Sequence, residues 1–221
     1  GFCPLAIFRE RQEIFIITFN KKKPFFPTPA TIGICGVSAN AGVTHLCIAL
    51  SNFLHSRYLV STAYMEMNAS HEIALLNKRG ETISDSKLYF RKKGVDYYPD
   101  VTIRKMTELL HRDYEYSILD FGVLTPHTRL EFLHCDKRIV LCNVSPWKAT
   151  QFDKFVHELI KYKIPLEEVI FVNAYGDILK KNQEQIYKKY GIRVDPAPLL
   201  CDPFHITSGC FHFFEQLMKG E

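Results

Sequence analysis

The stretch from Ile32 to Leu46 constrains the fold of this chain more than any other. It reads Ile-Gly-Ile-Cys-Gly-Val-Ser-Ala-Asn-Ala-Gly-Val-Thr-His-Leu, an apolar run followed by small residues and then by a helical pattern. This order predicts a buried strand, a tight turn and the first turn of a helix. The N–H groups at a helix start attract anions, so the turn is suited to holding a phosphate. We therefore expect an α/β domain with a ligand site at this turn.

The spacing of the turn approximates the phosphate-binding pattern G-x-x-x-x-G-K-[ST]. In that pattern backbone amides cradle the phosphates, the Lys reaches the β and γ oxygens, and the hydroxyl binds magnesium. Gly42 takes the place of the second glycine and Thr44 that of the hydroxyl residue. Val37 replaces the first glycine, with Gly36 one residue earlier, and Val43 replaces the Lys. Taken alone, the loop fits an ordinary strand-to-helix turn equally well.

Replacement of the Lys by Val43 has a calculable consequence. A charge-assisted contact to a phosphate contributes about 1.5–3 kcal/mol, so its loss weakens binding roughly ten- to a hundred-fold. Hydrolysis is expected to suffer more, because the same Lys stabilises charge in the transition state. The amides and dipole of the helix start remain as a weaker anion site. His45 either adds a proton-dependent charge there or simply caps or packs.

Apolar runs and helical patterns alternate along the rest of the chain. Expected strands cover 32–37, 61–67, 116–121, 137–144, 169–173 and 196–200; expected helices cover 43–56, 104–112, 149–162, 179–190 and 208–219. Continuous apolar strands separated by helices predict a mostly parallel sheet covered by helices on both faces, which is a three-layer α/β fold. Such sheets bind ligands at the carboxyl ends of their strands. Residues 85–98 predict a small hairpin with Gly94 near its turn.

The length of 221 residues suits one α/β domain, and a hydrophobic content of 47% is enough for a full core. We place the domain at 31–221. Residues 1–30 are expected to be an amino-terminal extension, or the tail of an upstream domain with a linker. The linker is indicated at Lys21–Pro29, where three lysines and three prolines disfavour regular structure.

The net charge and the cysteine content indicate which partners and which cellular compartment to expect. A formal net charge of +4 does not by itself indicate a nucleic-acid or membrane surface. The basic and aromatic segment 89–98 either contacts such a partner or forms a solvated hairpin with its aromatics in the core. Seven cysteines without a C-x-x-C pair favour a reducing compartment, so we expect a cytoplasmic protein. The nine histidines show no metal-ligand spacing.

With these residues in view, the region 31–219 resembles the MinD/ParA group of deviant P-loop ATPases, which includes the TadZ/CpaE-type proteins of pilus assembly. The loop of that group is K-G-G-x-G-K-[ST]-[ST], and here it becomes Ser38-Ala-Asn-Ala-Gly-Val-Thr-His45. Both family lysines are thus replaced, by Ser38 and Val43. The resemblance implies that the following residues contact the nucleotide: Gly36, Ser38, Asn40, Gly42, Val43, Thr44, His45 and Asn173.

Other landmarks of the group fall in the same order. Glu66 and Asn68 occupy the places of its D-x-D residues, and Asp120 closes a strand that is similar to the Walker B strand. The resemblance implies that Asp120 and Thr44 hold magnesium, that Glu66 orients water, and that Asn173 contacts the adenine base. The residues alone leave other roles open: Asp120 bonded to a loop amide or to Thr44, Thr44 as a helix cap, Glu66 as a solvated strand end, and Asn173 as a turn cap.

The resemblance implies a degenerate MinD/ParA-like protein. It is expected to bind ATP and Mg²⁺ weakly or not at all, with no confident catalytic residue; Glu66 and Asp120 are the candidates. Its expected role is to bind protein partners, and a second copy of itself, in localising a bacterial assembly such as a pilus or secretion system. One alternative is an active dimerising ATPase that borrows a cation from Lys148 or Arg104. Another is an interaction domain without a ligand.

Overall fold

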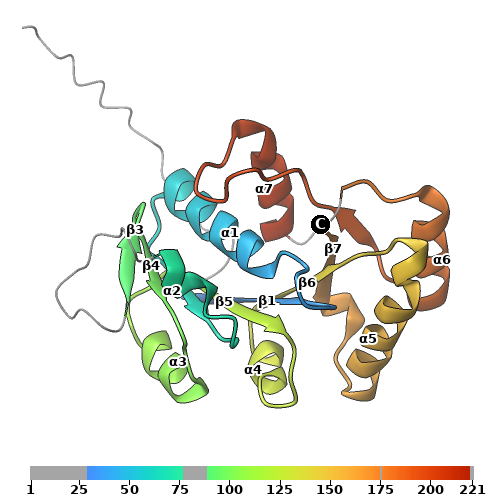
Figure 1. The fold of residues 1–221 in the computed structure, drawn as a ribbon, viewed down its shortest axis with the longest axis horizontal. Helices are drawn as coiled ribbons and strands as arrows, with labels where there is room; N and C mark the ends of the chain where they lie inside the picture. Colours follow the sequence, from blue (N-terminus) through green and yellow to red (C-terminus); the bar gives the residue numbers. More distant parts are fainter. Residues whose placement is uncertain (1–28, 77–88, 175, 220–221) are drawn as a thin grey trace, which may run out of the picture.

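The computed structural model of the protein describes residues 29–76, 89–174 and 176–219 (Figure 1). Within them, eight strands form one sheet in the order β3-β4-β2-β5-β1-β6-β7-β8. The strands are β1 (Ala30–Gly36), β2 (Thr62–Glu66), β3 (Phe90–Lys92), β4 (Val95–Tyr98), β5 (Tyr116–Val123), β6 (Lys137–Cys142), β7 (Val169–Asn173) and β8 (Val194–Pro196). Neighbouring strands are parallel except for β3 and β4, which are antiparallel.

Helices cover both faces of this sheet. They are α1 (Val43–Tyr58), α2 (Glu72–Leu76), α3 (Ile103–Leu110), α4 (Arg129–Leu133), α5 (Ala149–Lys161), α6 (Lys180–Tyr190) and α7 (Phe211–Lys219). Figure 1 shows α1 and α7 above the sheet and α3, α4 and α5 below it. The three-layer α/β fold predicted from the sequence is therefore confirmed. No helix in the described ranges has both the length and the apolar character that a bilayer crossing requires.

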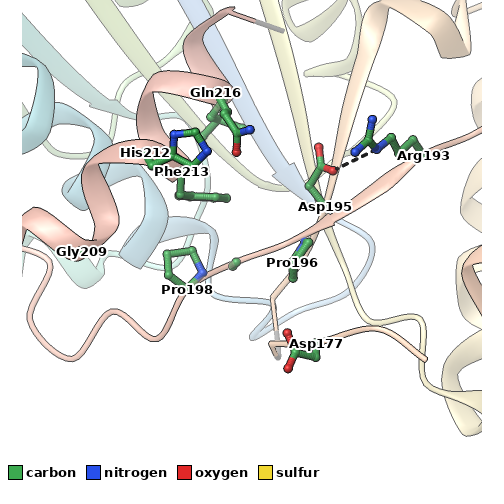
Figure 2. Close-up of a pocket in the computed structure, with 11 residues that line it drawn as sticks. Asp177, Arg193, Asp195, Pro196, Pro198, Gly209, His212, Phe213 and Gln216 are labelled. Carbon is green, nitrogen blue, oxygen red and sulfur yellow. Dashed lines mark ion pairs between the residues drawn. The ribbon is translucent and has the colours of Figure 1, made fainter. Parts of the chain in front are cut away.

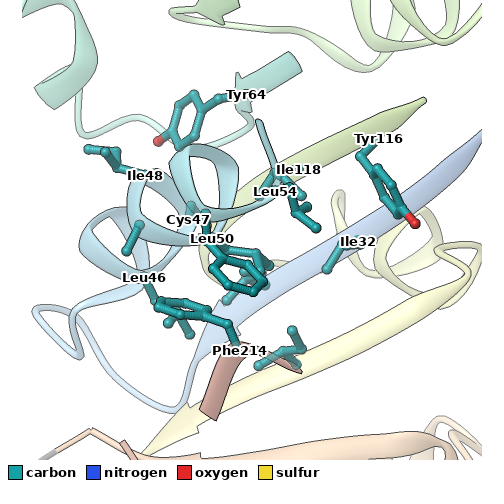
Figure 3. Packing of buried hydrophobic residues seen from close by; sticks show 14 of the residues in the cluster. Ile32, Leu46, Cys47, Ile48, Leu50, Leu54, Tyr64, Tyr116, Ile118 and Phe214 are labelled. Carbon is teal, nitrogen blue, oxygen red and sulfur yellow. The ribbon is translucent and has the colours of Figure 1, made fainter. Parts of the chain in front are cut away.

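The core between α1, α7 and the sheet is built mainly from aliphatic and aromatic side chains. Ile32 of β1 and Ile118 of β5 point toward α1, and Figure 3 shows them packed with Leu50 and neighbouring residues of that helix. Phe214 of α7 closes this core from the other side, with its ring 4.9 Å from that of Phe53. Because α1 is enclosed by the sheet and by α7, its middle, from Leu46 to Leu54, is buried on all sides.

Two polar residues of α1, Ser51 and Asn52, are buried in this core. Ser51 donates a hydrogen bond to the carbonyl of Cys47 at 2.8 Å. Asn52 donates to the carbonyl of Ile48 at 2.8 Å and to the hydroxyl of Tyr97 at 2.9 Å. These bonds offset the cost of removing a hydroxyl and an amide from water.

The expected helices and strands are found with small shifts of their ends, except for the last strand. The strand expected over 196–200 is wrong: β8 is Val194–Pro196, because buried Val194 pairs with Phe171 of β7. Ala197 still donates to the Asn173 carbonyl of β7 at 2.9 Å, but the strand goes no further, and Pro198 has no N–H to donate. Helices α2 and α4 were not expected; five residues each are too few to show a period.

The expected hairpin is present as β3 and β4, with Lys93 and Gly94 in the left-handed conformation at its turn. Of the two interpretations of this segment, the structure favours the solvated hairpin with its aromatics in the core: Phe90, Tyr97 and Tyr98 are buried, whereas Arg91 and Lys93 are exposed. Arg91 donates to Asp96 at 2.6 Å, and Lys93 donates to the carbonyl of Phe204 at 3.0 Å. Residues 85–88 of this segment, the linker through residue 28 and the extension before it lie outside the described residues.

Candidate functional site

The turn between β1 and α1 has the backbone of an anion-binding loop. Asn40 and Gly42 have φ values of 60° and 89°, whereas Ala41 between them does not have a positive φ. Gly42 precedes α1, and its carbonyl accepts the first helical bond from Leu46 at 3.0 Å. Glycine adopts this left-handed conformation without the strain that a side chain would introduce. The first-turn N–H groups of a helix have no acceptor within the helix, so they are suited to an external anion.

Gly36 allows the turn to fold back closely on β1. A Cβ atom at this position would lie 2.9 Å from the Cβ of Ala41, 3.0 Å from Val43 Cγ2 and 3.1 Å from the Ser38 carbonyl oxygen. Such contacts are too short for carbon atoms, so any side chain here would displace the loop. Gly36 therefore supports the loop from beneath rather than facing a ligand.

A cavity of about 330 Å³, here called the loop cavity, opens over this turn. Its lining includes most of the predicted nucleotide-contacting residues: Ser38, Asn40, Gly42, Val43, Thr44 and His45. The lining also includes Asn68, Ser70 and Glu72, together with Gly122 and Val123. No described residue of this lining is Lys or Arg. The side chains thus offer a phosphate little positive charge, which leaves backbone amides as the principal donors.

Val43 takes the place of the phosphate-binding Lys as a core residue. Only 6% of its surface is exposed, and it belongs to the apolar cluster between α1 and the sheet. Its Cγ2 atom faces the backbone of Gly36. The position therefore supports the packing under the loop and supplies no charge to the cavity.

A second cavity of about 600 Å³, here called the apolar cavity, adjoins the first one. The two cavities share Ala41, Gly42 and His45, and the remaining lining is Leu46, Leu141, Ala174, Gly176, Ala197, Pro198, Leu199 and Leu200. His45 Nε2 lies 2.7 Å from the carbonyl oxygen of Leu200, to which it donates a hydrogen bond. His45 therefore joins α1 to the loop after β8, which is the packing role among its predicted alternatives.

Asp120 lies behind the loop cavity and is fully buried. Its Oδ1 accepts hydrogen bonds from the Asn68 amide and the Gly122 N–H, each at 2.9 Å, and its Oδ2 accepts one from the Tyr64 hydroxyl at 2.6 Å. Burial raises the pKa of Asp120 above its usual range, although the bonds from Tyr64, Thr44 and Gly122 oppose this shift. The predicted alternative of bonding to a loop amide and to Thr44 is thus realised in the structure. Tyr64 carries no sequence signal for this role, since an aromatic residue on an apolar strand is typical of core.

Glu66 is also fully buried rather than solvated at its strand end. Its Oε1 accepts hydrogen bonds from Ser70 Oγ at 3.1 Å and from the Ile73 N–H at 3.3 Å. Its Oε2 accepts one from the Asp100 N–H at 3.2 Å. Glu66 therefore joins β2 to the segment before α2 and to the loop after β4, and it does not line either cavity.

Asn173 ends β7, where its side chain bonds to two loops. Its Oδ1 accepts from the Val144 N–H at 3.2 Å and its Nδ2 donates to the Gly176 carbonyl at 2.8 Å. It is buried and lines neither cavity, although Ala174 and Gly176 beside it line the apolar cavity. The structure thus uses Asn173 as a cap, and its contact with a base stays a prediction.

The two cations proposed as substitutes for the missing Lys lie elsewhere. Arg104 is an exposed residue of α3, and its Nε lies 3.7 Å from the carboxylate of Glu108. Lys148 is exposed in a short 3₁₀ turn at Pro146–Lys148. Neither residue lines the loop cavity or the apolar cavity.

A third cavity, of about 410 Å³, lies between β8 and α7 and contains none of the predicted site residues. Figure 2 shows Arg193 and Asp195 of this edge across from His212 and Gln216 of α7. The Arg193 guanidinium lies 3.6 Å from Asp195, whose pKa is raised by burial. Among the described residues, no three His, Cys, Asp or Glu side chains gather in a way that would hold a metal ion.

The fold is that of the ParA/MinD-type P-loop ATPases among the solved structures. A protein of Borrelia burgdorferi B31 described as a plasmid partition protein and bound to AMPPNP has a TM-score of 0.61 and 14% identity, over 87% of this chain and 98% of that one. MinD of Aquifex aeolicus has a TM-score of 0.61 and 13% identity, over 87% and 97%.

A cobyrinic acid a,c-diamide synthase of Mycobacterium smegmatis, bound to an ATP analogue and magnesium, has a TM-score of 0.53 and 11% identity, over 86% of this chain and 94% of that one. The sequence matches no protein-family model and no curated protein. At these identities the similarity establishes the fold, and the function must be argued from the site.

Proposed function

We propose that this protein is a degenerate member of the ParA/MinD group that binds a nucleotide weakly, does not hydrolyse it, and acts by binding and positioning protein partners. The observation that carries the proposal is Val43, a buried core residue at the place of the phosphate-binding Lys. Ser38, at the place of the second family lysine, supplies no charge either. Hydrolysis needs positive charge at the transferred phosphate, and the lining supplies none from Lys or Arg among the described residues.

The two adjoining cavities support the nucleotide part of this proposal. The loop cavity offers the first-turn amides of α1 to phosphates, and the apolar cavity offers the aliphatic walls that suit a base. Because Ala41, Gly42 and His45 line both cavities, one molecule would contact both. The AMPPNP in the Borrelia protein and the ATP analogue in the synthase are ligands of proteins with the same fold.

The partner-binding part rests on the resemblance and on the kinds of protein that share the fold. A MinC:MinD complex of Aquifex aeolicus is among the structures with this fold, so a protein partner binds at least one such domain. We propose the same mode of action here, in the cytoplasm, with a second copy of the chain or another protein as partner. The TadZ/CpaE resemblance favours a bacterial pilus or secretion assembly as the setting.

Calorimetry with ATP and a phosphate-release assay test the proposal directly. The wild-type protein is expected to bind ATP weakly and to release no phosphate above background. Val43→Lys should tighten ATP binding roughly ten- to a hundred-fold, as expected for one charge-assisted phosphate contact. Val43→Met is the matched control, because it adds length without charge and should leave the affinity unchanged.

Other results of these two assays would support one of the alternative functions or contradict the assignment of Val43. Phosphate release by the wild-type protein would support the alternative of an active ATPase. No binding by the wild type or by Val43→Lys would contradict a nucleotide site and leave an interaction domain. If Val43→Lys and Val43→Met behaved alike, the assignment of Val43 to the Lys position would be wrong.

A further inference from the structure

Magnesium is implied by the fold, since the synthase that shares it binds an ATP analogue together with magnesium. In this chain the expected ligands are the Thr44 hydroxyl and the Asp120 carboxylate. A hydrated Mg²⁺ ion keeps several waters and demands near-octahedral oxygen ligands, with the waters donating to nearby carboxylates. The residues fit the ion only if Asp120 can receive such donors from the cavity.

Asp120 is already supplied with donors by the protein. Tyr64 on β2 donates to Oδ2 at 2.6 Å, and the Asn68 amide and the Gly122 N–H donate to Oδ1 at 2.9 Å each. Asn68 also donates to the Asp120 carbonyl at 3.1 Å, and its own Oδ1 accepts from the Ser70 N–H at 2.9 Å. Both oxygens of the carboxylate, and both ends of the Asn68 amide, are therefore engaged.

These donors also separate Asp120 from the place of the ligand. Asn68, Gly122 and Thr44, whose hydroxyl also bonds to Asp120, line the loop cavity, whereas Asp120 and Tyr64 do not and are fully buried. An ion in the cavity would face the nitrogen of the Asn68 amide, which cannot ligate magnesium. To reach Asp120, the ion would have to take the place of the Asn68 amide or of the Thr44 hydroxyl and leave that donor without its acceptor, which is costly away from water.

The Tyr64 hydroxyl is a lasting donor rather than an exchangeable one. Its side chain is fully buried and its hydroxyl donates to Asp120 Oδ2 at 2.6 Å, so solvent does not compete for this bond. The Tyr64, Thr44 and Asn68 side chains and the Gly122 N–H thus already donate to the carboxylate, which leaves no lone pair ready for donors from metal-bound waters. Asp120 therefore does not fit the ion as a ligand.

We infer that Asp120 is a structural acceptor and not a magnesium ligand, and that Tyr64 and Asn68 make the loop cavity a site for a metal-free nucleotide. Tyr64 and Asn68 act through Asp120 and are positioning residues. This inference rests on the proposed function in one respect, namely that a nucleotide binds in the cavity. The structural part, the closed set of bonds around Asp120, is independent of any ligand.

Calorimetry of the wild-type protein with AMPPNP, in excess Mg²⁺ and in EDTA, tests the ligand part. The affinities are expected to agree within experimental error. Asn68→Asp places a second carboxylate beside Asp120, so AMPPNP should be repelled in EDTA and rescued several-fold by Mg²⁺. Asn40→Asp is the matched control: it adds the same charge to the cavity wall away from Asp120, and its loss of affinity should not be rescued.

A magnesium requirement in the wild-type protein would overturn the inference, as would an Asn68→Asp variant that is indifferent to the ion. Thermal unfolding of the ligand-free protein in EDTA tests the structural part. Tyr64→Phe should lower the unfolding midpoint by several degrees, because a buried carboxylate oxygen loses its donor; exposed Tyr187→Phe should not. An unchanged midpoint for Tyr64→Phe would overturn the inference even if no nucleotide binds, an outcome that by itself would contradict only the proposed function.

Discussion

Glu66→Gln distinguishes a structural carboxylate from a catalytic one. Glu66 is fully buried and accepts three hydrogen bonds, two of them from the backbone N–H groups of Ile73 and Asp100. A Gln side chain has nearly the same shape but only one acceptor oxygen. Whichever way its amide turns, at least one backbone N–H loses its acceptor and faces an NH₂ group. A carboxylate kept only for activating water would lose nothing in stability from this change.

The expected cost follows from the number of bonds lost. A buried donor left unsatisfied costs about 1–3 kcal/mol. Glu66 is also the register neighbour of Asp120 on β5, so removal of its charge relieves a like-charge repulsion. This relief offsets part of the loss, and we expect a net decrease of about 1–2 kcal/mol in the free energy of unfolding. For a chain of this size that corresponds to a fall of roughly 2–8 °C in Tm.

Urea denaturation of the ligand-free protein, followed by circular dichroism, measures the difference. Glu72→Gln is the control, because Glu72 is an exposed carboxylate of the same segment and its replacement should change the stability by less than about 0.5 kcal/mol. A stability equal to or above that of the wild type for Glu66→Gln would refute the structural role and restore the catalytic hypothesis.

Three further changes test the packing and the charges. Phe214→Ala should cost about 3–5 kcal/mol in urea denaturation, because its buried ring closes the core over α1. Gly94→Ala should cost about 2–4 kcal/mol, since its φ is 81° and a Cβ would meet the His55 ring at 1.9 Å; Gly191→Ala, with a φ of 70° and no neighbour within 4 Å, should cost only about 1–2 kcal/mol. Burial lowers the pKa of Lys137 from 10.5 to about 8, so between these values the unfolded chain binds more protons than the folded one. The stability of the wild type relative to Lys137→Met should therefore rise with pH across this window, by at most about 1.4 kcal/mol per pH unit, in denaturation series at stepped pH.

The strand-turn-helix unit could be predicted from the sequence because each of its parts has a local cause. An apolar run makes β1, a glycine is suited to the left-handed position 42, and an apolar face makes α1. Much of the lining of the loop cavity could be predicted as well, because residues 38–45 are consecutive in the chain. The continuous apolar runs of β5, β6 and β7 likewise predicted the parallel sheet.

What could not be predicted depends on contacts between distant residues. The hydroxyl of Tyr64 meets Asp120 only because β2 and β5 are neighbours in register, which no single segment encodes. Whether Glu66 faces solvent or loop amides depends on the course of the segments around Ser70 and Asp100. The strand predicted over 196–200 is misplaced because Pro198, which has no N–H for a sheet, follows so soon after Pro196, the one residue of that range that belongs to β8.

The enclosure of α1 determines how a bound molecule would change amide hydrogen exchange in the rest of the protein. The helix that presents its first turn to the ligand is also the most deeply packed one, held between β1, β5 and α7. Its buried part, from Leu46 to Leu54, cannot loosen separately from the body of the molecule. Amide protons of this part should therefore exchange with solvent only through global unfolding, and a ligand at residues 42–45 should slow their exchange and that of the whole sheet by the same factor.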